Sequence, residues 1–174
     1  MLAGGPRLPS WRRDVDPLGL LGAVFGGTGW GAAAPGTRRP MWTAIAGPAG
    51  VLIAGAAVVA GFGALFPASL TGEVYRPSDV LRGVPGPAAE QLVYTTGVGL
   101  MCFAVVALMP LPPCDGWTLL KRFLPGVVSA EPLLAGRRVG SVLLLVLMAV
   151  PIGGVPPLHR VLDVVVTPLA RLLL

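Results

Sequence analysis

Residues 107–125 read ALMPLPPCDGWTLLKRFLP, and this stretch holds the sharpest break in the chain. An apolar run of helical length ends in three prolines, and Cys114-Asp115-Gly116 opens an amphipathic segment behind them. Proline lacks an amide donor and clashes with the preceding turn, so we expect the helix to end near Met109. Asp115 then starts a new helix. Its carboxylate either caps that helix, by accepting from an amide of the first turn, or serves a functional site.

The composition is that of a membrane protein. Of the 174 residues, 54% are hydrophobic and 12% are charged, and the mean hydropathy is +0.78. A soluble domain carries about 25% charged residues, so this chain has too little polar surface to cover a globule. The glycines and prolines lie inside apolar runs, where membrane helices tolerate them. We therefore expect a single all-α integral membrane domain over residues 1–174, with the lipid bilayer as a partner.

Short basic clusters between the apolar runs produce the net charge of +5. A nucleic-acid-binding protein would carry a continuous basic face with stacking aromatics, so no nucleic acid partner is expected. Arg38 and Arg39 precede one long apolar run, and Lys121 and Arg122 follow the next. The loop 73–90 between these runs is poor in basic residues. The positive-inside rule then predicts a multi-pass cell-membrane protein with its N-terminus and the Asp115 side in the cytoplasm.

The uncharged runs define the expected elements. About 20 apolar residues cross a bilayer as a helix. Glycines weaken the run over 17–37, each by up to about 1 kcal/mol relative to alanine, which favours a membrane-associated or re-entrant segment over an ordinary span. The tail is apolar with three spaced charges, which is typical of an amphipathic helix at the membrane interface. The expected elements are a cytoplasmic segment 1–16, the glycine-rich segment 17–37, transmembrane spans over 41–68, 92–110 and 139–157, and the tail 158–174.

The sequence also predicts roles for the small residues, the cysteines and the histidine. Small residues in the first long run would let another helix approach closely; they are Ala46, Gly47, Ala49, Gly50, Ala54 and Gly55. Cys102 and Cys114 form no CxxC pair, so we expect small buried apolar side chains rather than a zinc ribbon or a redox motif. The only histidine, His159, is expected at the membrane interface beside Arg160.

The segment from Met109 to Gly116 resembles the proline-bracketed Asp-Gly motif of the site-2 protease family, which are intramembrane zinc metalloproteases. Three further stretches match family motifs in the same order along roughly residues 14–125; they are Asp16-Pro17-Leu18-Gly19, Gly29-Trp30-Gly31 and Ala46-Gly47-Pro48. The resemblance implies a helical membrane core. It also implies that Asp115 occupies the position of the family's third zinc ligand.

The sequence departs from the family at its catalytic motif. HExxH supplies two imidazole ligands and the glutamate that activates water, but this chain contains no HExxH and a single histidine. Ala107 and Val51 stand near the positions where the family has asparagine, and the family's Lys-Pro-Val-Pro run is replaced. Because a catalytic zinc needs three protein ligands and an open position, we expect neither bound zinc nor peptide hydrolysis by this chain.

Three functions remain open at this point. The first is an inactive pseudoprotease that binds a transmembrane helix or partner protein between its own helices. The second is a truncated reading frame of an active intramembrane zinc metalloprotease, in which an HExxH helix precedes Met1 and zinc is the cofactor. The third is a small non-enzymatic membrane subunit of a larger complex, in which the break at Pro110–Gly116 packs against another chain.

Overall fold

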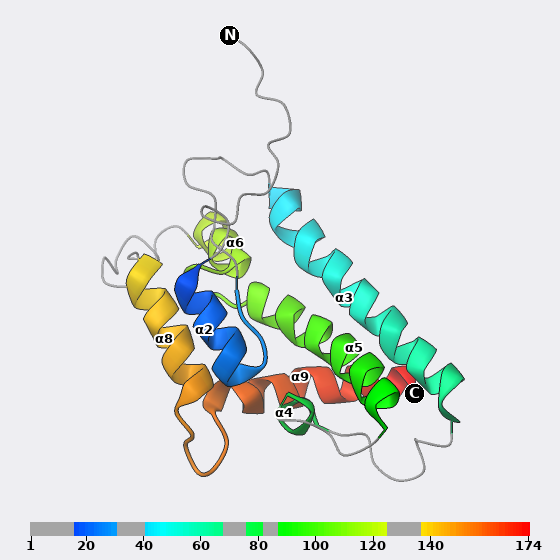
Figure 1. Ribbon diagram of the computed structural model, residues 1–174. Coiled ribbons are helices and arrows are strands. Elements are labelled where there is room, and N and C mark those ends of the chain that lie inside the picture. Colours follow the sequence, from blue (N-terminus) through cyan, green and yellow to red (C-terminus); the bar gives the residue numbers. More distant parts are fainter. Residues whose placement is uncertain (1–15, 31–40, 68–75, 82–86, 125–136) are drawn as a thin grey trace.

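The computed structural model describes residues 16–30, 41–67, 76–81, 87–124 and 137–174 (Figure 1). In these ranges the chain forms helices α2 (Pro17–Gly26), α3 (Met41–Leu65), α4 (Pro77–Val80), α5 (Ala88–Ala107), α6 (Asp115–Phe123), α8 (Arg137–Ala149) and α9 (Pro157–Leu173). No β-strand forms in the described residues, so the predicted all-α class is confirmed there. The expected segment 1–16 (apart from Asp16), residues 31–37, and residues 73–75 and 82–86 of the loop 73–90 lie outside them.

Within the described ranges, two helices are long and apolar enough to cross a membrane: residues Ala44–Leu65 of α3, and the whole of α5. The two pack against each other along much of their length (Figure 1). Gly55 of α3 faces Gly97 of α5, and a Cβ on Gly55 would lie 2.8 Å from the carbonyl oxygen of Gly97. Two backbones can approach this closely only where side chains are absent. Of the small residues in the first long run, Gly55 therefore serves helix packing within the chain.

Helix α8 covers only part of the interval 139–157. It ends at Ala149, directly before Val150 and Pro151, and its 13 residues rise about 20 Å, which is less than the hydrocarbon thickness of a bilayer. A turn follows, in which Gly153 and Gly154 have φ angles of 66° and 85°. Glycine adopts this left-handed backbone without a steric penalty. The interval is therefore a short helix and a turn rather than one continuous helix.

The glycine-rich run begins with a regular helix. Helix α2 spans 10 residues and lies beside α8 (Figure 1). Its buried glycines allow close contact: a Cβ on Gly26 would lie 2.7 Å from Cε of Met148, and one on Gly22 would lie 2.8 Å from the Trp30 ring. At about 15 Å, α2 is too short to cross a bilayer alone. The residues that weaken an isolated helix here permit its packing against a neighbour.

Helix α9 runs across α3 and α5 instead of alongside them (Figure 1). The predicted tail helix is present, and one of its sides is buried in the bundle, at Leu158, Leu162, Val166 and Ala170. Asp163 joins α9 to α4, because its carboxylate accepts hydrogen bonds from the amide and the hydroxyl of Ser78, both at 2.8 Å. The tail is thus both amphipathic and part of the packed structure.

Candidate functional site

The break before Asp115 is tightly packed within the chain. Gly116 lies against the main chain of Leu108 and Met109, and a Cβ at this position would overlap the Leu108 carbonyl. On the other side of the break, Gly140 of α8 lies against the main chain of Pro112, which is fully buried. Helix α6 also contacts α3. The prolines therefore follow the end of α5, as predicted. The residues behind them contact the end of α5 through Gly116, α8 through Pro112, and α3 through helix α6.

Asp115 is the first residue of α6, and the residue at the cap position is Cys114. The expectation that Asp115 is the capping residue is therefore wrong by one position. A helix capped by Asp115 would begin at Gly116, whereas α6 begins at Asp115 itself. The carboxylate is half-buried in the first turn of α6, where the partial positive charge of the helix end favours an anion. Lys121 and Arg122 occupy the last turn, where the helix end favours cations.

Both cysteines are buried, as predicted, and neither forms a disulfide. Cys114 stands beside Asp115, at the position before α6. Burial, reinforced by the negative charge of Asp115, raises the pKa of Cys114 to about 12. Without a metal ion, the thiol at this position is therefore protonated at neutral pH.

His159 does not lie exposed beside Arg160, and the expectation of an interfacial side chain is wrong. Only 2% of its surface is exposed, and its Nε2 lies 3.0 Å from the carbonyl oxygen of Gly26 at the end of α2. A helix end leaves its last carbonyls without intrahelical donors, so a ring nitrogen placed there satisfies one of them. His159 therefore joins α9 to α2, and sequence periodicity gave no signal of a partner so distant in the chain.

The residues around Asp115 do not fit a zinc site. A catalytic zinc requires three protein ligands. Among the described residues, no three His, Cys, Asp or Glu side chains come together in a way that could hold a metal ion. Nε2 of His159, the only histidine of the chain, lies against the Gly26 carbonyl at the end of α2. The described residues therefore supply no complete ligand set for metal-assisted hydrolysis.

Asp16 opens the Asp16-Pro17-Leu18-Gly19 stretch, and its structural role was not evident from the sequence. Its Oδ1 accepts from the amide of Leu18 at 3.0 Å and so caps α2. Its Oδ2 accepts from Nε1 of Trp30 at 3.0 Å and from Oγ of Ser141 at 3.2 Å. One carboxylate thus joins the start of α2, the Gly-Trp-Gly stretch and α8. The two motif stretches that matched separately in the sequence are in direct contact here.

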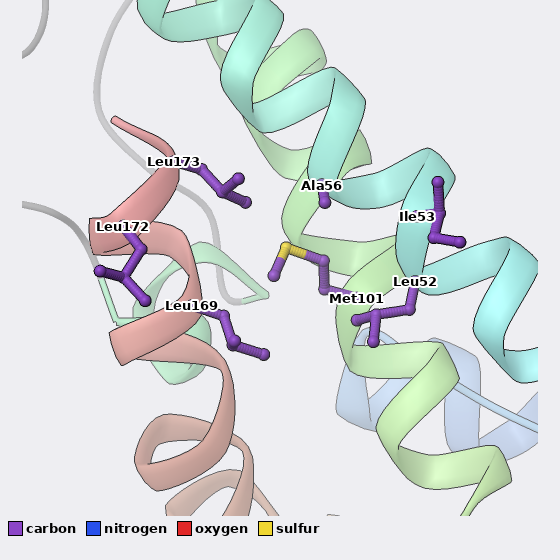
Figure 2. A pocket seen from close by; sticks show the side chains of 7 residues that line it. All are labelled: Leu52, Ile53, Ala56, Met101, Leu169, Leu172 and Leu173. Atoms are coloured by element: carbon purple, nitrogen blue, oxygen red, sulfur yellow. The ribbon is translucent and has the colours of Figure 1, made fainter.

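An apolar cavity of about 290 Å³ lies between α3, α5 and α9 (Figure 2). Its lining is formed by Leu52, Ile53, Ala56, Met101, Leu169, Leu172 and Leu173. None of these side chains can donate or accept a proton at neutral pH. The cavity therefore offers volume for hydrocarbon and no group for acid–base or nucleophilic chemistry, and it does not include Asp115.

Comparison with known proteins identifies no relative: no family model matches the chain, and neither the curated proteins nor the solved structures gave a match. The part of the chain that the structure describes is helical and contains two candidate membrane-spanning helices. The resemblance of its motifs to the site-2 protease family stays a prediction.

Proposed function

We propose that this chain is a multi-pass membrane protein with a site-2-protease-like core and no complete zinc site, and that it acts by binding a transmembrane helix of another protein. The proposal combines three features: apolar helices of membrane length, motif stretches that pack together, and a face of α3 that no described part of the chain covers. The uncovered face of α3 is the observation that supports binding of a partner helix.

The surface of α3 supports the membrane location. Only 22% of its apolar window is buried inside the structure, whereas the core helix of a soluble protein would be mostly buried. Trp42, Ile53 and Leu65 are between 68% and 73% exposed. Large apolar side chains exposed along a whole helix are unfavourable in water and favourable in lipid. With Lys121 and Arg122 beyond the end of α5, the positive-inside rule favours a cytoplasmic Asp115 side.

The uncovered face of α3 consists of small residues at helical spacing; we call it the small-residue face, and it comprises Gly47, Gly50, Ala54, Ala57 and Gly61. A methyl group built on Gly47, Gly50 or Gly61 would meet none of the described residues within 4 Å. Gly55, on another side of the helix, is already in contact with α5. Small residues at transmembrane helix surfaces permit close helix–helix approach, so this face fits a partner helix better than it fits lipid chains.

The contacts of the proline break bear on the competing subunit hypothesis. That hypothesis expects the break to pack against another protein, whereas Gly116 and Pro112 pack against Leu108 and Gly140 of the same chain. Contacts of α6 with α3 point the same way. These intrachain contacts support a protease-like core over a coincidental match of motifs.

Replacement of Gly50 by leucine is expected to leave the fold intact and to abolish partner binding. The side chain would extend into open space within the described structure, so the thermal unfolding midpoint should stay close to that of the wild type. On a helix–helix interface, however, it would hold the two backbones apart. To measure binding, a photo-crosslinking amino acid replaces Ala54 and the chain is irradiated in the native membrane. A bound partner then appears as a discrete crosslinked adduct.

The matched control for this experiment is Ile45→Leu, because Ile45 is 42% exposed on a different side of α3. The adduct should persist in Ile45→Leu and disappear in Gly50→Leu. An adduct of equal yield in both variants, or no adduct in the wild type other than to lipid, would refute the proposed helix-binding function.

A further inference from the structure

The apolar cavity between α3, α5 and α9 joins the surface of α3 to the core of the bundle. Its innermost lining residue is Met101 of α5, of which 1% is exposed. Its outer lining includes Ile53 of α3 and Leu172 of α9, which are 69% and 84% exposed. Figure 2 shows the α3 and α9 side chains on opposite sides of the cavity, with Met101 between them. We call this cavity the α3–α9 recess.

The chemistry of the lining suits hydrocarbon. None of the seven lining side chains is charged or carries a hydroxyl or amide group. The charge nearest along α9, Arg171, lies about half a turn around the helix from Leu169 and so points away from the recess. A cavity of about 150 Å³ with leucine, isoleucine and phenylalanine walls stays dry and binds benzene. The α3–α9 recess, at about 290 Å³, is therefore expected to hold hydrocarbon and not water.

The position of the recess determines which hydrocarbon can reach it. Leu52, Ile53 and Ala56 lie around the middle of the candidate span Ala44–Leu65, and Met101 lies about one turn from the middle of α5. Helix α9 contacts both α3 and α5, so a further helix, whose axis must stay about 8–10 Å from each neighbour, has no room between these walls. Acyl chains surround a spanning helix at this depth, and a single chain is thin enough to enter.

We infer that the α3–α9 recess binds one acyl chain of a bilayer lipid, which enters past Ile53 and Leu172 and contacts Met101. An empty recess would leave its lining atoms without van der Waals partners, and an acyl chain supplies them. Ala56 lies about 200° around α3 from Ala54 of the small-residue face, so lipid in the recess leaves the proposed partner site free. The inference rests on the proposed membrane location.

Photolabelling of the full chain tests the inference. The chain is reconstituted into nanodiscs of a phosphatidylcholine that carries a photoreactive diazirine near the middle of one acyl chain, and peptide mass spectrometry locates the lipid adducts. Ile53 is exposed and reports insertion into the bilayer, whereas Met101 is buried and should be labelled only by a chain inside the recess. We expect adducts at both residues in the wild type.

Ala56→Leu places extra carbons in the recess, and its Met101 adduct should fall at least about fivefold because the leucine and the acyl chain would overlap. Its Ile53 adduct should persist. The matched control is Leu65→Phe, which enlarges a 73% exposed side chain of α3 outside the recess and should keep both adducts. Should Ala56→Leu fail to insert, the smaller change Ala56→Val makes the same comparison.

The outcomes separate this inference from the proposed function. A wild-type chain labelled at Ile53 but not at Met101, as expected if a protein side chain fills the recess, would overturn the lipid inference and leave the membrane location in place. A Met101 adduct of equal yield in Ala56→Leu would also overturn it. A chain that stays outside the nanodiscs, without label at either residue, would overturn the membrane location itself.

Discussion

Alanine in place of Gly116 is expected to destabilise the fold by about 3 kcal/mol or more, because the added methyl group would overlap main-chain atoms of Leu108 and Met109. A flexible side chain could move aside, but this backbone is held by the fully buried Pro112 and its contact with Gly140. In an unconstrained helix the same substitution stabilises by up to about 1 kcal/mol. A loss of stability in Gly116→Ala, rather than a gain, therefore indicates that Gly116 is closely packed at the proline break.

Gly99→Ala is the matched control, since Gly99 lies in α5 and a Cβ there would meet none of the described residues within 4 Å. Thermal unfolding of both variants, in the same nanodiscs and followed by circular dichroism, makes the comparison. Gly99→Ala should be neutral or slightly stabilising, and Gly116→Ala should unfold at a clearly lower temperature. If the two midpoints agree, the close packing of Gly116 against the end of α5 is incorrect.

Asp16→Ala is expected to cost about 3 kcal/mol. The substitution removes a helix cap, which contributes about 1 kcal/mol, and two further hydrogen bonds to a carboxylate, each worth about 1.5–3 kcal/mol when not shared. It also leaves the indole nitrogen of Trp30, a buried side chain, without its acceptor. The three donors share one acceptor group, so their contributions add only partly.

A graded series checks this account of Asp16. Ser141→Ala removes a single donor at 3.2 Å and should cost about 1 kcal/mol, whereas Asp79→Ala, at an exposed acid in α4, should change stability by no more than about 0.5 kcal/mol. Unfolding midpoints should therefore fall in the order Asp79→Ala, Ser141→Ala, Asp16→Ala. An Asp16→Ala variant as stable as Ser141→Ala would mean that the carboxylate does not join the three segments.

Local chemistry explains which parts of the fold were predictable. The prolines after Met109 end α5, and the uninterrupted apolar run before Pro67 forms α3, because backbone donors and hydropathy act over neighbouring residues. The same rules misplace the interval 139–157. Its average hydropathy suits a span, but Pro151 and the adjacent glycines end the helix at Ala149. Composition alone overestimates a helix wherever a turn is also apolar.

Contacts between distant residues explain the rest. Asp16 and Ser141 are 125 residues apart, and His159 and Gly26 are 133 apart. Neither pair leaves a periodic signal in the sequence, because each depends on how two helices meet in space. His159 was expected at the interface because a lone histidine beside an arginine is a surface pattern. Its burial follows from the end of α2, whose carbonyl needs a donor.

The candidate site combines a predictable position with an unpredictable environment. The sequence alone indicated Asp115 and the shortage of imidazole ligands around it. The burial of Cys114 was also expected, but the sequence could not indicate that His159 is buried and bonded at the end of α2. This contact occupies the only imidazole of the chain, and no three ligand side chains come together among the described residues. The proposed function therefore depends on binding surfaces, chiefly the small-residue face of α3, and not on hydrolysis.

The zinc content of the purified chain tests the central claim most directly. The chain is reconstituted with excess zinc and desalted, and the zinc that remains is quantified by elemental mass spectrometry. Because fewer than three ligands meet at Asp115 among the described residues, we predict no stoichiometric zinc in the wild type and the same background in Asp115→Ala. About one zinc per chain in the wild type, lost in Asp115→Ala, would contradict the account and restore a metalloprotease centre.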